Sequence, residues 1–218
     1  VSAFKVDNES YDLLNVIKYD CAGQPVWNNP LRIDSLQSKV KSVNLLKSDD
    51  NNYIILWNTN SEIFVAKFSE NGQILIDKTH LITYAVNQIT NLKSTVDKFG
   101  GIYITFNIGS ELKLRVLHLN RSLQKSTDRP FNLSEHYSIT VDDLLIDTNN
   151  RLIAGLSCGI GRFFNKVDSV SQIITDRSIG QYSGQMCNMI TSKAHNLVMI
   201  NDNAFVSIHK MSDSYNDD

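Results

Sequence analysis

A short polar turn between two apolar segments returns along the chain at a nearly constant interval, and this recurrence constrains the fold more than any other feature. Each copy of the turn carries a glutamine, and successive glutamines are separated by 49, 51 and 48 residues. They are Gln24, Gln73, Gln124 and Gln172. A period of this length indicates one supersecondary unit copied several times, in which each copy buries apolar surface against the next.

The apolar segments of each unit favour β-strands. The stretch IFVAKFSENGQILID at residues 63–77 predicts two strands joined by a turn at Asn71-Gly72, because Ile, Val and Phe suit strands and Asn-Gly suits tight turns. A second strand-turn-strand pattern precedes each hairpin, at residues 43–57, 89–106, 141–156 and 186–200. Each unit therefore contains four strands, and the units at the two ends of the chain are each short by about one strand.

Four strands per unit and a period of this size are typical of β-propeller blades. A twisted four-stranded sheet has two apolar faces, and blades packed face to face around an axis bury both of them. We therefore predict an all-β propeller domain over residues 1–211, with units at 1–36, 37–86, 87–136, 137–183 and 184–211, and a polar tail at 212–218. A closed ring of five blades and a run of blades from a larger, six- to eight-bladed propeller both fit the pattern.

The repeats also resemble a known group. The segment GGIYITF at residues 100–106 and the turn KFSENGQI at 67–74 resemble the degenerate repeats of bacterial β-propeller proteins, and the resemblance extends over nearly the whole chain as a pattern. It implies a binding module, since such repeats occur in extracellular and effector proteins of diverse binding function. In this chain Leu123 and Ser171 replace the turn glycines Gly23 and Gly72. The Gly-His and Trp-Asp pairs of WD40 repeats and the aspartate box of sialidases are missing.

Composition excludes several classes of partner. The 218 residues carry a net charge of -2, which gives no field to attract nucleic acid, and no apolar run reaches the roughly 18–20 residues of a membrane span. Cys21, Cys158 and Cys187 lie far apart without metal-ligand spacing, so we expect free, partly buried thiols and no cofactor. Unpaired cysteines favour a reducing compartment slightly, without excluding secretion.

No pattern of histidines predicts a metal site or a catalytic base. The five histidines are not spaced so that two would share one face of a strand. His118 occupies the position that holds Lys18, Lys67 and Lys166 in other units. We therefore expect His118 to be a solvent-facing strand residue, because alternate positions of a strand point to opposite faces.

Most of the acidic residues fall where hairpin turns are expected. Asp50, Asp97 and Asp147 sit in or next to such turns, which Asp and Asn favour. A propeller glycosidase would need two or three carboxylates on the inner strands that face the axis. Asp142 and Asp143 are the only acids at the start of an expected inner strand, so one unit of five is acidic there.

The strands repeat while the loops differ, and this pattern favours one partner protein over several equivalent small sites. We predict a non-catalytic module that binds another protein or another domain of a larger chain. A glycan-binding, lectin-like propeller is the alternative, and a glycoside hydrolase-type enzyme is the third possibility. The contact residues are expected at the inner ends of the blades, over the central channel, at Lys41, Lys93, Asp142, Asp143 and Met189.

Overall fold

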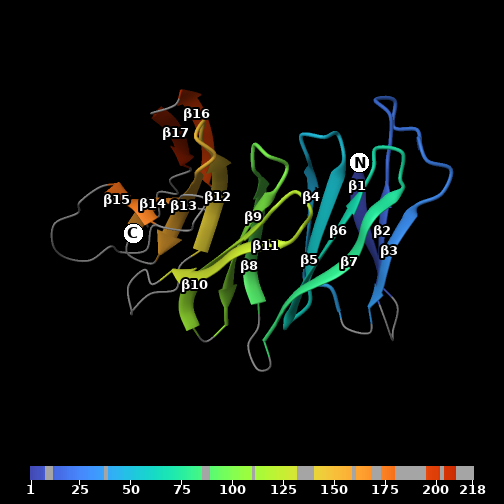
Figure 1. Cartoon of the computed structure of the whole chain (residues 1–218), viewed down its shortest axis with the longest axis horizontal. Coiled ribbons are helices and arrows are strands. Elements are labelled where there is room, and N and C mark those ends of the chain that lie inside the picture. Colours follow the sequence, from blue (N-terminus) through green and yellow to red (C-terminus); the bar gives the residue numbers. More distant parts are fainter. Residues whose placement is uncertain are drawn as a thin grey trace, which may run out of the picture.

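The strands of the protein are antiparallel and fall into five sheets, each drawn from one continuous stretch of the chain (Figure 1). The computed structural model describes residues 1–7, 12–36, 39–84, 89–109, 111–131, 140–158, 161–167, 173–179, 195–201 and 204–209. In every sheet the strands lie side by side in chain order. Each sheet is therefore a simple meander, which we call a blade and number from one to five.

The first blade has three strands, the second to fourth have four each, and two strands of the fifth are described. The first blade contains β1 (Ser2–Asp7), β2 (Asp12–Ile17) and β3 (Leu31–Leu36). The second contains β4 (Ser42–Lys47), β5 (Tyr53–Asn58), β6 (Glu62–Phe68) and β7 (Ile74–Thr83). The third contains β8 (Ile89–Val96), β9 (Ile102–Ile108), β10 (Glu111–Leu119) and β11 (Lys125–Phe131). The fourth contains β12 (Thr140–Ile146), β13 (Leu152–Cys158), β14 (Gly161–Val167) and β15 (Ile173–Ile179), and the fifth contains β16 (His195–Asn201) and β17 (Ala204–His209).

The predicted all-β propeller architecture, with incomplete blades at both ends, is confirmed. The first strands of successive complete blades contact one another, β4 against β8 and β8 against β12, and we call these the inner strands. Figure 1 shows the blades as a row from the blue N-terminal sheet to the red C-terminal hairpin, which lie at opposite ends of the view. Among the described residues the row is open. The division into residues 1–211 and a tail at 212–218 stays a prediction.

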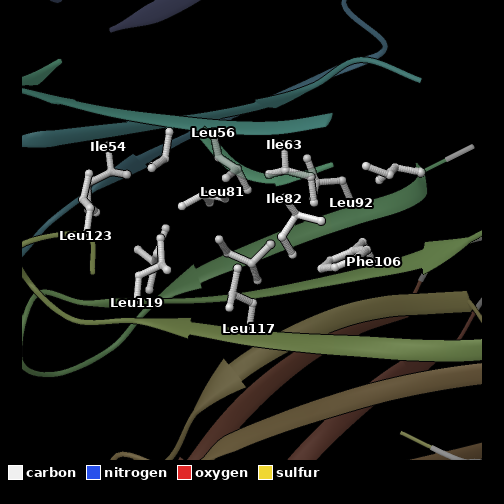
Figure 2. Packing of buried hydrophobic residues seen from close by; sticks show 14 of the residues in the cluster. Ile54, Leu56, Ile63, Leu81, Ile82, Leu92, Phe106, Leu117, Leu119 and Leu123 are labelled. Carbon is white, nitrogen blue, oxygen red and sulfur yellow. The ribbon is translucent and has the colours of Figure 1, made fainter. Parts of the chain in front are cut away.

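The largest apolar cluster lies between the second and third blades (Figure 2). It contains side chains from both sheets, such as Leu56 and Ile63 on one side and Phe106 and Leu117 on the other. Smaller clusters join the first blade to the second and the third blade to the fourth. A fully buried Leu, Ile or Phe side chain contributes about 1.5–3 kcal/mol, so these interfaces hold neighbouring blades together.

Both faces of a blade are buried, as the propeller prediction requires. On β5, Ile54 and Leu56 belong to the cluster shared with the third blade, whereas Ile55 and Trp57 belong to the cluster shared with the first. This alternation follows from the two-residue period of a strand. A continuous apolar run such as Ile54–Trp57 is therefore needed wherever a sheet has neighbours on both sides.

The hairpin turns share one geometry, which explains their Asp and Asn residues. The side-chain oxygen of Asp20 accepts hydrogen bonds from the backbone N–H groups of Ala22 and Gln24, at 2.9 and 2.8 Å. Asp97, Asn120 and Asp147 make the same pair of bonds in their own turns. A carboxylate or amide that bonds to the backbone two and four residues later fixes the tight turn.

Trp27 lies before β3 and packs against Gly72 in the second blade, with its indole N–H donating to the carbonyl of Glu70 at 3.3 Å. Cys21 is a free thiol as expected, but it is exposed at the tip of a turn.

Candidate functional site

Equivalent positions on the three described inner strands carry three different polar side chains. Asn44 lies opposite Leu56, Lys93 opposite Thr105, and Asp143 opposite Gly155, so the three occupy one register position in successive blades. Their neighbours are Val43 and Leu45 in β4, Leu92 and Ser94 in β8, and Asp142 and Leu144 in β12. At this register position the three inner strands therefore carry different chemical groups.

Two of the inner strands contain a β-bulge at the same level. In β8 the pairing shifts between Thr90 and Lys93, and in β12 it shifts between Val141 and Asp143, so each strand holds one residue more than its partner. Asn91, inside the first bulge, has a φ of 52°, a conformation that asparagine tolerates better than most residues. Bulges of this kind re-aim side chains and are common beside active sites.

The bulges place Lys93 and Asp142 on facing sides of the interface between the third and fourth blades. Lys93 and Thr105 lie on the same face of the third blade. That face also carries Tyr103, which belongs to the cluster shared with the fourth blade. On β12, Val141 and Leu144 belong to that same cluster. Alternation from Leu144 puts Asp142, the extra residue of the bulge, on the side of the third blade.

The burial of these groups differs. Lys93 is exposed, whereas Asp142 and Asp143 are half-buried. Oδ1 of Asp143 accepts the backbone N–H of Leu144 at 2.9 Å. Thr105 is fully buried, and its hydroxyl has no hydrogen-bond partner among the described residues. The site thus combines an exposed cation, a buried hydroxyl and a carboxylate within neighbouring inner strands.

Amide groups of the second blade extend this set of polar residues. Asn44 donates to the carbonyl of Leu92 at 3.4 Å, and Asn58 donates to the carbonyl of Ile89 at 3.3 Å. Ser42 donates to the side-chain oxygen of Asn58. These bonds join β4 and β5 of the second blade to β8 of the third and fix the distance between the two inner strands.

The structure brings some of the predicted contact residues together. Lys93, Asp142 and Asp143 lie on the neighbouring inner strands β8 and β12, and Lys41 is exposed just before β4. Met189 lies outside the described residues. The role of these residues in binding a partner stays a prediction. Thr105 was not predicted, although a single threonine within the run Ile102–Phe106 is the signal that could have identified it.

The expectation that His118 faces solvent is wrong. His118 is buried, with Nε2 at 2.7 Å from Oδ2 of Asp97, and its ring stacks on Tyr103 with 4.3 Å between centroids. Lys67, the equivalent residue of the second blade, is also buried and donates to Asp50 at 2.8 Å. A buried cation needs a partner, and the turn carboxylate of the same blade provides one.

These pairs lower the pKa of both carboxylates. Burial by itself would raise the pKa of Asp97, but hydrogen bonds from His118 and from the backbone of Phe99 and Gly101 outweigh burial and lower it. Burial would likewise raise the pKa of Asp50, and hydrogen bonds from Lys67 and Asn52 hold it well below its ordinary range. Both carboxylates are ionised at neutral pH and serve the fold, since each fixes a turn.

In the part of the chain that the structure describes, there is no helix long and apolar enough to cross a membrane. No group of three or more His, Cys, Asp or Glu side chains that could hold a metal ion occurs there either. The candidate site therefore rests on the inner strands alone.

Sequence comparison finds no relative: no protein-family model matches, and no curated protein matches significantly. Solved structures do match. A GH43 β-1,3-galactosidase aligns with a TM-score of 0.50 at 9% identity, over 94% of this chain and 52% of that one. Exo-β-1,3-galactanases from Phanerochaete chrysosporium and Clostridium thermocellum align with TM-scores of 0.45 and 0.44, both at 9% identity, over 81% and 82% of this chain and 49% and 48% of theirs. The chain spans about half the length of these structures.

The comparison with the galactosidase corrects two predictions. The fold that this chain shares over almost its whole length is that of a carbohydrate-active enzyme. The predicted non-catalytic module that binds another protein is therefore wrong, and so is the prediction that the chain is not an enzyme. The sequence misled here because variable loops over repeated strands occur in propeller enzymes as well as in propeller scaffolds. The resemblance to degenerate bacterial propeller repeats stays a prediction.

Proposed function

We propose that the protein is a carbohydrate-active propeller of the glycoside hydrolase type, in which Asp142 supplies one of the reacting carboxylates. The observation that carries the proposal is the position of Asp142, at a bulge on an inner strand of the blade interface. The shared fold supports it, because the solved enzyme has the same arrangement of strands.

Glycoside hydrolysis needs two carboxyl groups on opposite sides of the scissile bond. One donates a proton to the leaving oxygen, and the other acts as nucleophile or activates water. The inner strands β4 and β8 contain no Asp or Glu. The second carboxylate must therefore come from outside these two strands. The distance between the two carboxylates would decide the stereochemistry: about 5–5.5 Å for retention and about 6.5–9.5 Å for inversion.

Polar side chains on the second and third blades suit the binding of a sugar. Asn44, Asn91 and Thr105 offer amide and hydroxyl groups of the kind that hydrogen-bond to sugar hydroxyls. The first glycans to test are β-1,3-linked galacto-oligosaccharides, because the matching enzyme is named for that linkage.

The test is the release of reducing sugar from a panel of neutral and acidic oligosaccharides, compared between wild-type protein and variants. Asp142→Asn should lower the rate by about 10²–10⁴-fold, the usual contribution of a positioned acid or base. Asp77→Asn, an exposed acid on the outer strand β7, is the matched control and should leave the rate unchanged. Hydrolysis that survives Asp142→Asn but is lost in Asp143→Asn would move the role to the neighbouring residue. Absence of hydrolysis across the panel would overturn the proposal.

A further inference from the structure

Lys93 is an exposed cation on an inner strand, beside the carboxylate to which we assign catalysis. Among the described residues its side chain has no hydrogen-bond or ion-pair partner. In contrast, the buried basic side chains of Lys67 and His118 are each held by an aspartate. Lys93 is therefore the charge on the inner wall of the third blade that remains available to a ligand.

The repeat shows where the Lys93 side chain is directed. Asn44, its counterpart in the second blade, reaches across to the next inner strand and donates to the carbonyl of Leu92. Leu92 immediately precedes Lys93, just as Asp142 immediately precedes Asp143, so Leu92 and Asp142 are equivalent. By this equivalence, Lys93 faces the bulge that holds Asp142, as Asn44 faces the bulge next to Leu92.

A second donor lies on the same face. Thr105 is directly opposite Lys93 across the β8–β9 ladder, and such opposite residues have Cβ atoms about 4.5–5.5 Å apart. Its buried hydroxyl lacks a partner among the described residues, and a buried polar group without a partner is costly. The buried hydroxyl and Lys93 lie on the same side of the sheet, so a ligand oxygen drawn to Lys93 reaches the hydroxyl only where neighbouring side chains move aside.

Lys93 and Lys41 are exposed cations on and just before the inner strands β8 and β4, which contain no acid. The neighbouring strand β12 carries two carboxylates, Asp142 and Asp143, and each of them already interacts within the fold. An ammonium group binds a carboxylate or sulfate more strongly than it binds a neutral hydroxyl.

We propose that Lys93, with Thr105 beside it, forms a subsite for an anionic group on the glycan, either the carboxylate of a uronic acid or a sulfate ester. This inference rests on the proposed function and adds the substrate class: the protein acts on an acidic polysaccharide in preference to a neutral one.

Binding is measured by calorimetry on the Asp142→Asn protein, so that ligands stay intact, with three oligosaccharide sets of equal length: neutral galactans, uronic acid oligomers and sulfated galactans. We expect tighter binding of one anionic set, weakened as salt rises because salt screens exposed charges. Adding Lys93→Gln should lower that affinity about tenfold or more and leave the neutral set unchanged, as a charge-assisted hydrogen bond is lost. Whichever anionic set responds identifies the charged group.

Three further variants make the test specific. Lys93→Arg should keep most of the affinity for the anionic set, and Thr105→Val should lose part of it without losing the salt dependence. Lys125→Gln, an exposed lysine on the outer strand β11, should change nothing. Thermal melting confirms that each variant is folded.

Equal affinity for neutral and anionic sets, or no effect of Lys93→Gln on anionic binding, would overturn the inference. If neutral oligosaccharides are still hydrolysed in an Asp142-dependent manner, only the subsite at Lys93 is lost and the proposed function stands. If no oligosaccharide of any set is bound or hydrolysed, both fail together.

Discussion

Leu123 shows how a repeated turn constrains a single residue. Gly23 and Gly72 adopt φ values of 79° and 82°, and Leu123, at the same turn position of the third blade, has a φ of 59°. This left-handed conformation costs a residue with a Cβ about 1–2 kcal/mol. Leu123 offsets this cost by burial, because its side chain belongs to the cluster between the second and third blades (Figure 2).

Substitution of Leu123 should reverse the usual order of alanine and glycine. Both variants lose the buried side chain, but glycine also relieves the backbone strain. We expect Leu123→Gly to be more stable than Leu123→Ala by about 1 kcal/mol, measured as the free energy of unfolding in urea. At the exposed strand position Lys125, alanine should be the better of the two. If the alanine variant is more stable than the glycine variant at both positions, residue 123 is not strained.

The pair of Asp97 and His118 makes stability depend on pH. The pKa of Asp97 is lower in the folded protein than in the unfolded chain. Its contribution is therefore complete above the unfolded pKa of about 3.9, and it is lost as the pH falls through the folded value. We expect the loss of stability below about pH 4 to be smaller in Asp97→Asn than in the wild type, as followed by urea midpoints. If stability falls as steeply with decreasing pH in Asp97→Asn as in the exposed control Asp77→Asn, the prediction is refuted.

At the scale of the strands and turns, one carboxylate joins two blades. Asp50, in the turn between β4 and β5, binds Lys67 on β6 at 2.8 Å and Arg121 in the third blade at 3.2 Å. The two partners differ in exposure: the side chain of Lys67 is 5% exposed and that of Arg121 is 63% exposed. Water screens the second contact but not the first, so the two should differ in energy.

Double-mutant cycles separate these two contacts. The coupling energy between Asp50→Asn and Arg121→Gln should be about 0.2–1 kcal/mol, as for exposed pairs. The coupling between Asp50→Asn and Lys67→Gln should be about 1.5–3 kcal/mol, as for hydrogen bonds to charged groups in buried positions. Raising the salt concentration should reduce only the first. Equal couplings would mean that the interface between the blades, rather than burial, governs both contacts.

At the scale of the whole molecule, stability is unevenly distributed along the row of blades. The cluster between the second and third blades is the largest of the three clusters formed by the described residues. In a repeat protein each unit is stabilised mainly by its neighbours, so the blades that share the most apolar surface unfold last.

Hydrogen exchange should reveal this order. We expect the slowest-exchanging amides in β5, β6 and β9, whose side chains are buried on both sheet faces. Ile104→Ala, a fully buried position of that cluster, should cost about 2–5 kcal/mol and accelerate exchange in the second and third blades together. Uniform protection along all five sheets would show that the row unfolds as one cooperative unit.

Much of the fold could be predicted because it depends on local patterns. The glutamine period identified the repeat, and Gln24, Gln73 and Gln124 close equivalent turns through their carbonyl groups. The same alignment placed Leu123 at a glycine position, and the structure shows there the left-handed backbone of the equivalent glycines. The class of protein was not predictable in this way, because enzymes and scaffolds share the propeller and differ only in a few side chains.

The sequence by itself determined the four strands of the second, third and fourth blades, the chemistry of the turns and the apolar runs that face two neighbours, because each depends on residues close together in the chain. Only the tertiary structure decided that Lys67 and His118 are buried and that β8 and β12, which carry Lys93 and Asp142, contact each other. Burial of a cation depends on a turn carboxylate many residues away. A one-residue bulge reverses the side that each following residue faces, and the sequence pattern does not mark where the bulge falls.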